Sequence, residues 1–215
     1  MRLAFLALIF ILLGSFAHGT TECIGSVKAN RFIVYLHGID TESPSLQELE
    51  NRGVLKELAK SLNIRFALPR AKVACPTKIH QMCWTWAAKT SVDLAPVKSA
   101  IELAAADCFP SKNYDVLGFS NGGIAVASLL RLCEKVDFNL GITVGAAGGW
   151  FSSDPKTLQN CKPELISMLG TEDLPNQKPI RAFIAHLTSL NAPVSLIEYK
   201  GGHKLFYVPL YNLLK

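Results

Sequence analysis

The sequence predicts an α/β protein in which a mostly parallel sheet of about six strands carries helices on both faces. Segments rich in β-branched and aromatic residues alternate along the chain with segments whose leucines recur at helical spacing. Several of the predicted strands are apolar through their whole length, as is typical of strands that are buried on both faces. A strict alternation of strands and helices predicts a parallel sheet between two layers of helices.

Each element has its own local signal. Residues 31–36 (RFIVYL) are β-branched and aromatic and end at His37-Gly38, so they predict the first strand. Residues 45–62 carry leucines near helical spacing after Ser43-Pro44, a plausible helix start. Further strands are expected at 64–68, 114–119, 140–145, 165–169 and 194–199, and further helices at 92–106, 124–133, 180–190 and 205–214. Residues 71–90 form a long connection that contains cysteine and tryptophan.

Length and composition point to one globular domain. The chain has 215 residues, enough for a single well-packed core, and it is 49% hydrophobic and 18% charged. Its net charge of +5 is scattered along the sequence and forms no basic run. We therefore expect no nucleic-acid partner.

The N-terminus has the order of a secretory signal peptide. Arg2 precedes an unbroken apolar run at 3–13, and small residues follow up to Gly19. The run is shorter than the ~18 apolar residues that a membrane span needs. We predict a signal peptide at 1–19, cleaved after Ala17 or Gly19, with an uncleaved anchor as the alternative. The domain at 20–215 would then be secreted or periplasmic, without stable membrane insertion.

The cysteines favour disulfides over a metal site. All of them follow the predicted signal peptide, and an even number of cysteines in a secreted chain is typical of disulfide bonding, with free buried thiols as the alternative. The cysteine and histidine spacing does not resemble a zinc site, so no metal is expected. The six cysteines are Cys23, Cys75, Cys83, Cys108, Cys133 and Cys161.

A candidate nucleophile lies between the strand predicted at 114–119 and the helix predicted at 124–133. Residues 118–122 (GFSNG) fit G-x-S-x-G, in which a serine on a tight strand-to-helix turn projects its hydroxyl. Side chains at Gly118 and Gly122 would collide across that turn, and the helix N-terminus stabilises negative charge. We therefore predict that Ser120 is the nucleophile.

An acid and a base follow on later strand-end loops. Asp173 ends the segment GTED after one predicted strand, and His203 ends the segment GGH after the next. The carboxyl ends of parallel strands meet at one edge of a sheet, so these groups are expected to converge on Ser120. Alternatives remain open: Asp173 as a helix cap, Glu172 as the acid, and His203 as an ordinary loop residue.

An oxyanion also needs hydrogen-bond donors. We expect one from the backbone N–H of Asn121, directly after the nucleophile. The other is expected from Ile39 in the segment HGID at 37–40, where His37 is interpreted as a loop-shaping group.

These four segments together resemble the α/β-hydrolases. HGID resembles the oxyanion loop of that family, GFSNGG its nucleophile elbow, GTED its acid loop and GGH its histidine loop, and the signatures run from 31 to 203. The order and compact size resemble small carboxylesterases and acyl-protein thioesterases. The segment MCWTW at 82–86 resembles secreted esterases related to polyhydroxybutyrate depolymerases and feruloyl esterases.

The resemblance implies a three-layer α/β-hydrolase fold. Few residues separate the predicted signal peptide from the first predicted strand, so the leading β-hairpin of the family is expected to be missing. The segment at 146–163 is too short for a large lid domain. With this topology, the helices ending near Cys108 and Cys133 finish on one face, which favours a Cys108–Cys133 disulfide. Cys75–Cys83 and Cys23–Cys161 would then be the remaining pairs. Candidate pocket aromatics, for which packing in the core is the alternative, are Trp84, Trp86 and Trp150.

The functional hypothesis is a secreted serine esterase that cleaves carboxylic esters through an acyl-enzyme, without metal or cofactor. Its substrate would be a small or polymeric ester. Alternatives with the same triad are polyester, feruloyl or thioester hydrolysis. A hypothesis of another class is a catalytically silent, hydrolase-like binding protein. The presence of serine, acid and histidine together argues against that hypothesis.

Overall fold

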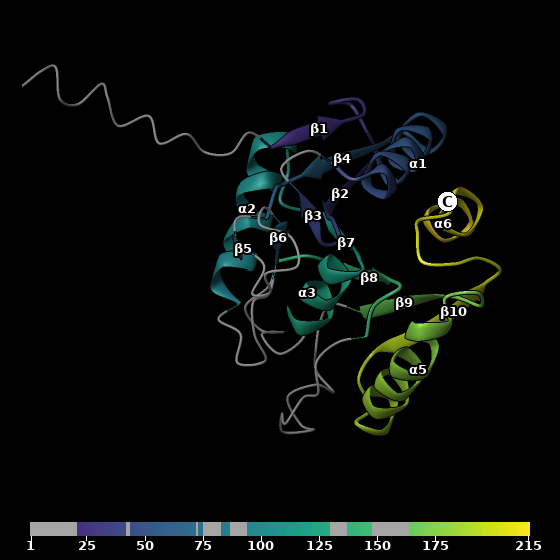
Figure 1. Ribbon diagram of the computed structural model, residues 1–215. Coiled ribbons are helices and arrows are strands. Elements are labelled where there is room, and N and C mark those ends of the chain that lie inside the picture. The colour runs from purple at the N-terminus through teal and green to yellow at the C-terminus, as the bar shows by residue number, and fades with distance from the viewer. Residues whose placement is uncertain are drawn as a thin grey trace, which may run out of the picture.

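The structure is a computed structural model that describes residues 21–41, 44–71, 73–74, 83–86, 94–129, 137–147 and 164–215. Its centre is a seven-stranded sheet in the order β1-β4-β2-β7-β8-β9-β10 (Figure 1). The strands of this sheet are β1 (Glu22–Ile24), β2 (Arg31–Leu36), β4 (Ile64–Leu68), β7 (Asp115–Phe119), β8 (Leu140–Val144), β9 (Glu164–Gly170) and β10 (Val194–Tyr199).

The strands from β4 to β10 run parallel to their neighbours, while β1 is antiparallel to β4. The prediction of about six strands is therefore one short, because the brief segment before β2 adds a single antiparallel strand to the edge of the sheet. A second, three-stranded sheet joins β3 (Asp40–Thr41), β6 (Cys83–Thr85) and β5 (Val73–Ala74). It places two strands in the long connection, where none was predicted.

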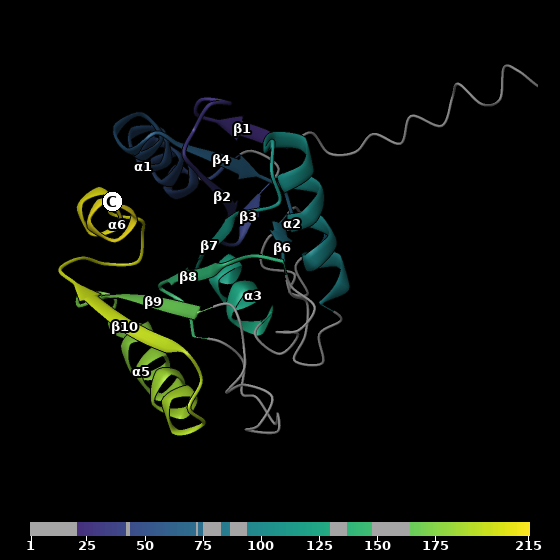
Figure 2. The same ribbon diagram turned by 180° about the vertical axis from the view of Figure 1, so that it is seen from behind.

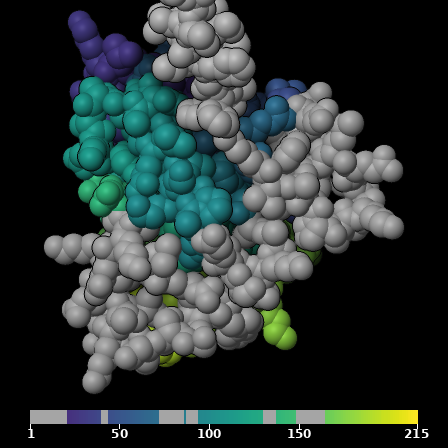
Figure 3. Space-filling view, turned by 90° about the vertical axis from the view of Figure 1, so that its left-hand side faces the viewer, coloured from purple at the N-terminus to yellow at the C-terminus, as the bar shows by residue number. Residues whose placement is uncertain are grey.

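Helices cover both faces of the sheet, as the sequence predicts (Figures 1 and 2). One layer contains α2 (Ala95–Cys108), α3 (Asn121–Leu129) and α5 (Leu174–Ser189), and the other contains α1 (Leu46–Leu62) and α6 (Tyr207–Leu214). Figure 3 views the molecule from the side that α2 covers.

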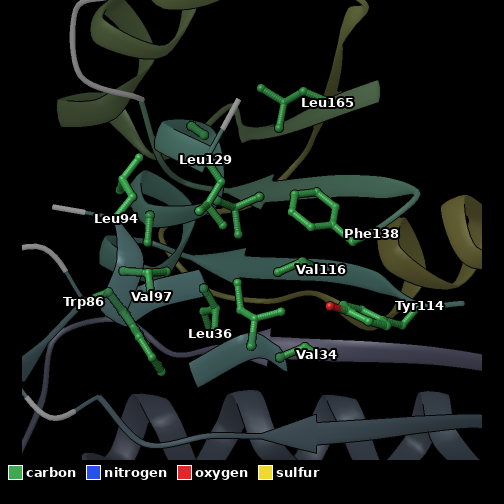
Figure 4. Packing of buried hydrophobic residues seen from close by; sticks show 14 of the residues in the cluster. Val34, Leu36, Trp86, Leu94, Val97, Tyr114, Val116, Leu129, Phe138 and Leu165 are labelled. Carbon is green, nitrogen blue, oxygen red and sulfur yellow. The ribbon is translucent and has the colours of Figure 1, made fainter. Parts of the chain in front are cut away.

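Alternate side chains of β2 pack against the helix layers on the two faces of the sheet. Val34 and Leu36 pack under α2 and α3, whereas Ile33 and Tyr35 pack under α1 and α6. All four are buried, which explains why the strand reads as one continuous apolar run. Figure 4 shows the cluster under α2 and α3, which contains Val34 and Leu36 and in which Leu36 lies nearer to Trp86.

Helix α5 begins six residues before its predicted start, at Leu174 instead of residue 180. The sequence there contains Pro175 and Pro179, and the prediction began the helix after the second proline, with Asp173 as a helix cap among the open alternatives. Pro175 lies in the first turn, where a proline is tolerated because its missing N–H would have no partner within the helix. Pro179 lies inside the helix and removes one internal hydrogen bond.

The disulfide joins Cys23 of β1 to the last residue of α2, Cys108, with Cα atoms 5.7 Å apart. The predicted pairs Cys108–Cys133 and Cys23–Cys161 are therefore wrong. The reason is the unpredicted strand β1, which lies against β4 and brings Cys23 to the C-terminal end of α2. The predicted Cys75–Cys83 pair lies outside the described side chains, as do Cys133 and Cys161.

Replacing both cysteines in the double variant Cys23→Ser/Cys108→Ser is expected to lower the free energy of unfolding by about 2–4 kcal/mol. The bond closes a loop with a sequence separation of 85 residues, so its loss frees the unfolded chain considerably. Urea denaturation of the oxidised wild type and the variant measures the difference. An unchanged midpoint, or a nonreduced peptide map that joins Cys108 to Cys133, would contradict the assignment.

Candidate active site

Ser120 occupies a sharp turn between β7 and α3. Its φ angle is 51°, in the left-handed region that non-glycine residues rarely adopt. Its N–H donates to the Val144 carbonyl at 2.9 Å, and its own carbonyl accepts from the N–H of Ile124 at 3.0 Å. The neighbouring strand and the following helix thus hold the strained turn on both sides, as the nucleophile-elbow interpretation requires.

The two flanking glycines allow this turn to close. A Cβ atom on Gly118 would lie 2.3 Å from the carbonyl oxygen of Gly122, across the turn. A Cβ atom on Gly122 would lie 2.1 Å from the carbonyl oxygen of Leu36 at the end of β2. The turn therefore packs directly against the main chain that leads into the segment HGID.

Three side chains from three strand-end loops meet at this turn. His203, in the loop after β10, has its Nε2 3.0 Å from Ser120 Oγ and its Nδ1 2.7 Å from Asp173 Oδ2. When Ser120 donates its hydroxyl proton to Nε2, the neutral imidazole carries its own proton on Nδ1 and donates it to the carboxylate. This tautomer leaves Nε2 free to take the serine proton, which is the arrangement of a general base.

The geometry distinguishes Asp173 from its alternatives. Asp173 is buried and stands at the N-cap position of α5, yet in the described part of the chain its side chain makes no capping hydrogen bond. Its carboxylate instead contacts His203 and Asn176. Glu172 is exposed, and its backbone N–H donates to the Gly201 carbonyl at 2.8 Å. The structure therefore brings Asp173 to the histidine.

Asn176 is a site residue that the sequence analysis missed. Its Nδ2 donates to Asp173 Oδ1 at 2.8 Å and lies 3.1 Å from His203 Nδ1. With Oδ1 occupied in this way, Oδ2 is the carboxylate oxygen that faces the imidazole. The signal for Asn176 is its spacing of three residues from Asp173, which brings two side chains together only in a helix. Because the helix was expected to start at 180, this spacing had no meaning in the prediction.

His37 fixes the segment HGID, which agrees with its interpretation as a loop-shaping group. The ring is buried, and its Nε2 accepts the backbone N–H of Ala71 at 3.1 Å. A peptide N–H can only donate, so the proton of the neutral ring is on Nδ1, which donates to the Gly38 carbonyl at 2.6 Å. A Cβ atom on Gly38 would lie 3.3 Å from Ser120 Cβ, so the loop passes directly beside the serine. The donor roles of Ile39 and Asn121 stay predictions.

Trp86 packs in the core. Core packing is the alternative that the sequence analysis left open beside a place in the substrate pocket. Its side chain is buried in the cluster that Figure 4 shows. It lies beside His37, with ring centroids 5.0 Å apart. The indole N–H donates to the His37 carbonyl at 2.9 Å, and the backbone N–H of Trp86 donates to Asn121 Oδ1 at 2.8 Å. The Asn121 side chain thus has a structural contact that the prediction, which valued only its backbone, missed. The side chain of Trp84 and all of Trp150 lie outside the described residues.

Tyr199 helps to hold the histidine loop. Burial, and then the negative charge of Asp173, raise the pKa of Tyr199 to about 12. The phenol therefore stays protonated at neutral pH, and its hydroxyl donates to the Lys204 carbonyl at 3.3 Å.

The described residues offer neither a candidate metal centre nor a candidate membrane span. They contain no group of three or more histidine, cysteine, aspartate or glutamate side chains that could hold a metal ion. Within the same residues, no helix is both long enough and apolar enough to span a membrane.

Comparison with solved structures confirms the predicted fold class. A SOBER1 variant from Arabidopsis thaliana superposes with a TM-score of 0.64 at 16% identity, over 86% of this chain and 95% of that chain. A carboxylesterase from Mesorhizobium loti gives a TM-score of 0.62 at 15% identity, over 90% and 91% of the two chains. The Bacillus cereus carboxylesterase gives 0.59 at 16% identity, over 91% and 92%. No protein-family model and no curated protein sequence matches the chain.

Proposed function

We propose that this chain is a serine hydrolase that cleaves carboxylic esters through Ser120, His203 and Asp173. Ser120 Oγ attacks the ester carbonyl carbon while its proton passes to His203 Nε2. The resulting oxyanion accepts hydrogen bonds from the backbone N–H groups of Ile39 and Asn121. His203 then gives the proton to the departing alkoxide, which leaves as an alcohol and an acyl-enzyme.

The second half of the reaction reverses these roles. Water attacks the acyl carbon and gives a proton to His203 Nε2, and the tetrahedral intermediate collapses to release a carboxylic acid. Ser120 recovers its proton from His203 as it leaves. Asp173 stays ionised throughout and stabilises the imidazolium that forms in each half.

The observation that carries the proposal is the continuous contact from Ser120 Oγ through His203 to Asp173, at 3.0 and 2.7 Å. The strained backbone of Ser120 adds to it, since such strain is concentrated at functional sites. The solved carboxylesterases that share this fold are consistent with ester cleavage. The same triad also serves the alternative polyester, feruloyl and thioester substrates, whereas a silent binding protein has no need of an aligned base.

A panel of nitrophenyl esters of graded acyl length tests the proposal. We expect hydrolysis of at least the short esters. Feruloyl, polyester and thioester substrates tested beside them separate the alternatives. A purified, folded protein that leaves all of these substrates intact would contradict the proposal.

Asp173→Asn is expected to reduce kcat by about 10⁴-fold, while Glu172→Gln changes it little. An amide at 173 offers the imidazole a donor as well as an acceptor and no longer stabilises its positive charge. Glu172 is the matched control, because it is the adjacent acid and its side chain is exposed. Steady-state kinetics on one nitrophenyl ester measures both variants. A large loss only in Glu172→Gln would reverse the assignment.

We also propose that residues 1–19 export the protein, so that the mature chain acts outside the cytoplasm. The Cys23–Cys108 disulfide supports this, because such bonds persist in oxidising compartments. N-terminal sequencing of the protein recovered from the periplasm or the medium is expected to begin after Ala17 or Gly19. An intact N-terminus on a membrane-bound product would favour the uncleaved anchor instead.

A further inference from the structure

The inner face of α1 is polar in its first half. Glu48 and Asn51 are buried there, with 4% and 1% of their surface exposed, while Leu46 is 74% exposed. A helix that packs on a sheet normally buries an apolar stripe, which α1 does only further along, with Leu55 and Leu58. A buried carboxylate and a buried amide are costly unless they are hydrogen-bonded, so their partners indicate what this face holds.

Those partners form one directed chain of hydrogen bonds that starts in the histidine loop. The backbone N–H of Leu205 donates to Asn51 Oδ1 at 3.0 Å, and Asn51 Nδ2 donates to the Tyr35 hydroxyl at 3.4 Å. Tyr35 donates in turn to Glu48 Oε2 at 2.9 Å, and Arg52 Nε pairs with Glu48 Oε1 at 3.0 Å. Every donor therefore points toward the carboxylate, an arrangement in which hydrogen bonds strengthen one another.

The charge distribution keeps this direction fixed. Burial, and then the adjacent charge of Glu48, raise the pKa of Tyr35 well above its usual value. Tyr35 therefore remains a donor at neutral pH. Since its proton goes to Glu48, its oxygen accepts from Asn51, which turns the amide oxygen of Asn51 toward the Leu205 N–H.

A second contact from the same helix holds the other side of the histidine. Gln47 Nε2 donates to the carbonyl oxygen of His203. Gln47 and Asn51 are four residues apart, so they lie on the same face of α1, one turn from each other. The two side chains are hydrogen-bonded to the histidine loop, Gln47 at the His203 carbonyl and Asn51 at the Leu205 N–H. We call Gln47, Asn51, Tyr35 and Glu48 the α1 clamp.

We propose that the α1 clamp is a positioning device for the catalytic histidine, a role that rests on the proposed function. His203 lies in a loop, and only its ring contacts Ser120 and Asp173. The clamp fixes the main chain that carries the ring, so the distance from Nε2 to Ser120 Oγ depends on it. Tyr35 precedes Leu36 and the oxyanion loop, so the same device links both loops to one helix. An imidazole displaced by about 1 Å costs about 100-fold in rate.

Gln47→Met tests the proposal in a folded protein, because Gln47 is exposed and methionine keeps its length. We expect kcat to fall about tenfold, with KM within about twofold and Tm unchanged, because one of two anchors is lost. Lys56→Met, an exposed position later in α1, is the matched control and is expected to change neither. Wild-type kcat in Gln47→Met would overturn the proposal.

A double variant shows whether the effect passes through the histidine. In His203→Ala, the residual rate comes from substrate binding and the oxyanion donors. Adding Gln47→Met to His203→Ala is expected to cause no further loss. A second tenfold loss in that background would mean that Gln47 acts on another part of the site, and would overturn the positioning role.

Amide hydrogen exchange tests the clamp independently of any activity. The Leu205 amide is expected to exchange slowly in the wild type and at least tenfold faster in Asn51→Leu, while amides of β7 stay protected. If Asn51→Leu does not fold, the same acceleration is expected, to a smaller extent, in Gln47→Met. Unchanged Leu205 exchange in the folded variant would overturn the clamp. A wild type that is inert toward esters but shows these exchange rates would contradict the esterase proposal and leave the α1 clamp in place.

Discussion

Ser120→Ala is expected to reduce ester hydrolysis by about 10⁴- to 10⁶-fold while leaving the fold intact. The substitution removes the Oγ that lies 3.0 Å from His203 Nε2, so no acyl-enzyme can form through this residue. Alanine and serine both tolerate the left-handed backbone poorly, so the variant keeps a strain similar to that of the wild type. Steady-state kinetics and thermal unfolding measure the two quantities.

Ser61→Ala is the control for this substitution. Ser61 is an exposed serine near the end of α1, where its hydroxyl donates to the Glu57 carbonyl at 2.8 Å. It lies outside the proposed site, so full activity is expected. A Ser120→Ala protein that retains the wild-type rate would show that the nucleophile is another group.

Gly122→Ala is expected to destabilise the protein by at least about 3 kcal/mol, or to prevent its folding. The new methyl group would lie 2.1 Å from the Leu36 carbonyl oxygen and 2.5 Å from the His37 carbonyl oxygen. Both are main-chain atoms, so no side-chain rotation relieves the collision. Either α3 or the oxyanion loop has to move, and any variant that folds is expected to lose activity as well.

Gly53→Ala is the matched control, a glycine-to-alanine change inside α1. A Cβ atom at this position has no described neighbour within 4 Å. Alanine is the better helix former, so the variant is expected to gain about 0.5–1 kcal/mol. Urea denaturation measures both variants. Equal stability of Gly122→Ala and the wild type would contradict the close packing of the elbow against β2.

The meeting of Ser120, Asp173 and His203 could be predicted because the position of each depends on local sequence. The turn around Ser120 spans only five residues, and Gly118 and Gly122 mark it in the local sequence. Asp173 and His203 each follow directly after an apolar strand, and parallel strands bring their carboxyl ends to one edge. No long-range knowledge is needed for that convergence beyond the strict alternation of strands and helices.

The parts that sequence reasoning missed depend on contacts between distant segments. The leucine spacing located α1 but not the inner face of its first half, where Leu46 and Leu49 are exposed and Glu48 and Asn51 are buried. The partners that hold these two polar residues include Tyr35 on β2 and the Leu205 amide, 154 residues after Asn51. A hydrophobic pattern carries no information about such partners.

The disulfide error has the same origin. Cys23 lies on a strand of three residues, too short for a reliable alternation pattern, and its position follows from pairing with β4. Once β1 is placed at that edge, the end of α2 is the neighbouring element that carries a cysteine. Register at a sheet edge, which the local sequence specifies weakly, decided the pairing.

The most direct measurement is the site of covalent labelling by a fluorophosphonate. Such probes phosphonylate a serine, with loss of fluoride, when a base removes the serine proton and donors stabilise the oxyanion. Intact-mass and peptide mass spectrometry of the treated wild type are expected to show one adduct, on Ser120, that is absent from Ser120→Ala and strongly slowed in Asp173→Asn. A folded wild type that takes up no probe, or takes it up on another residue, would contradict the account.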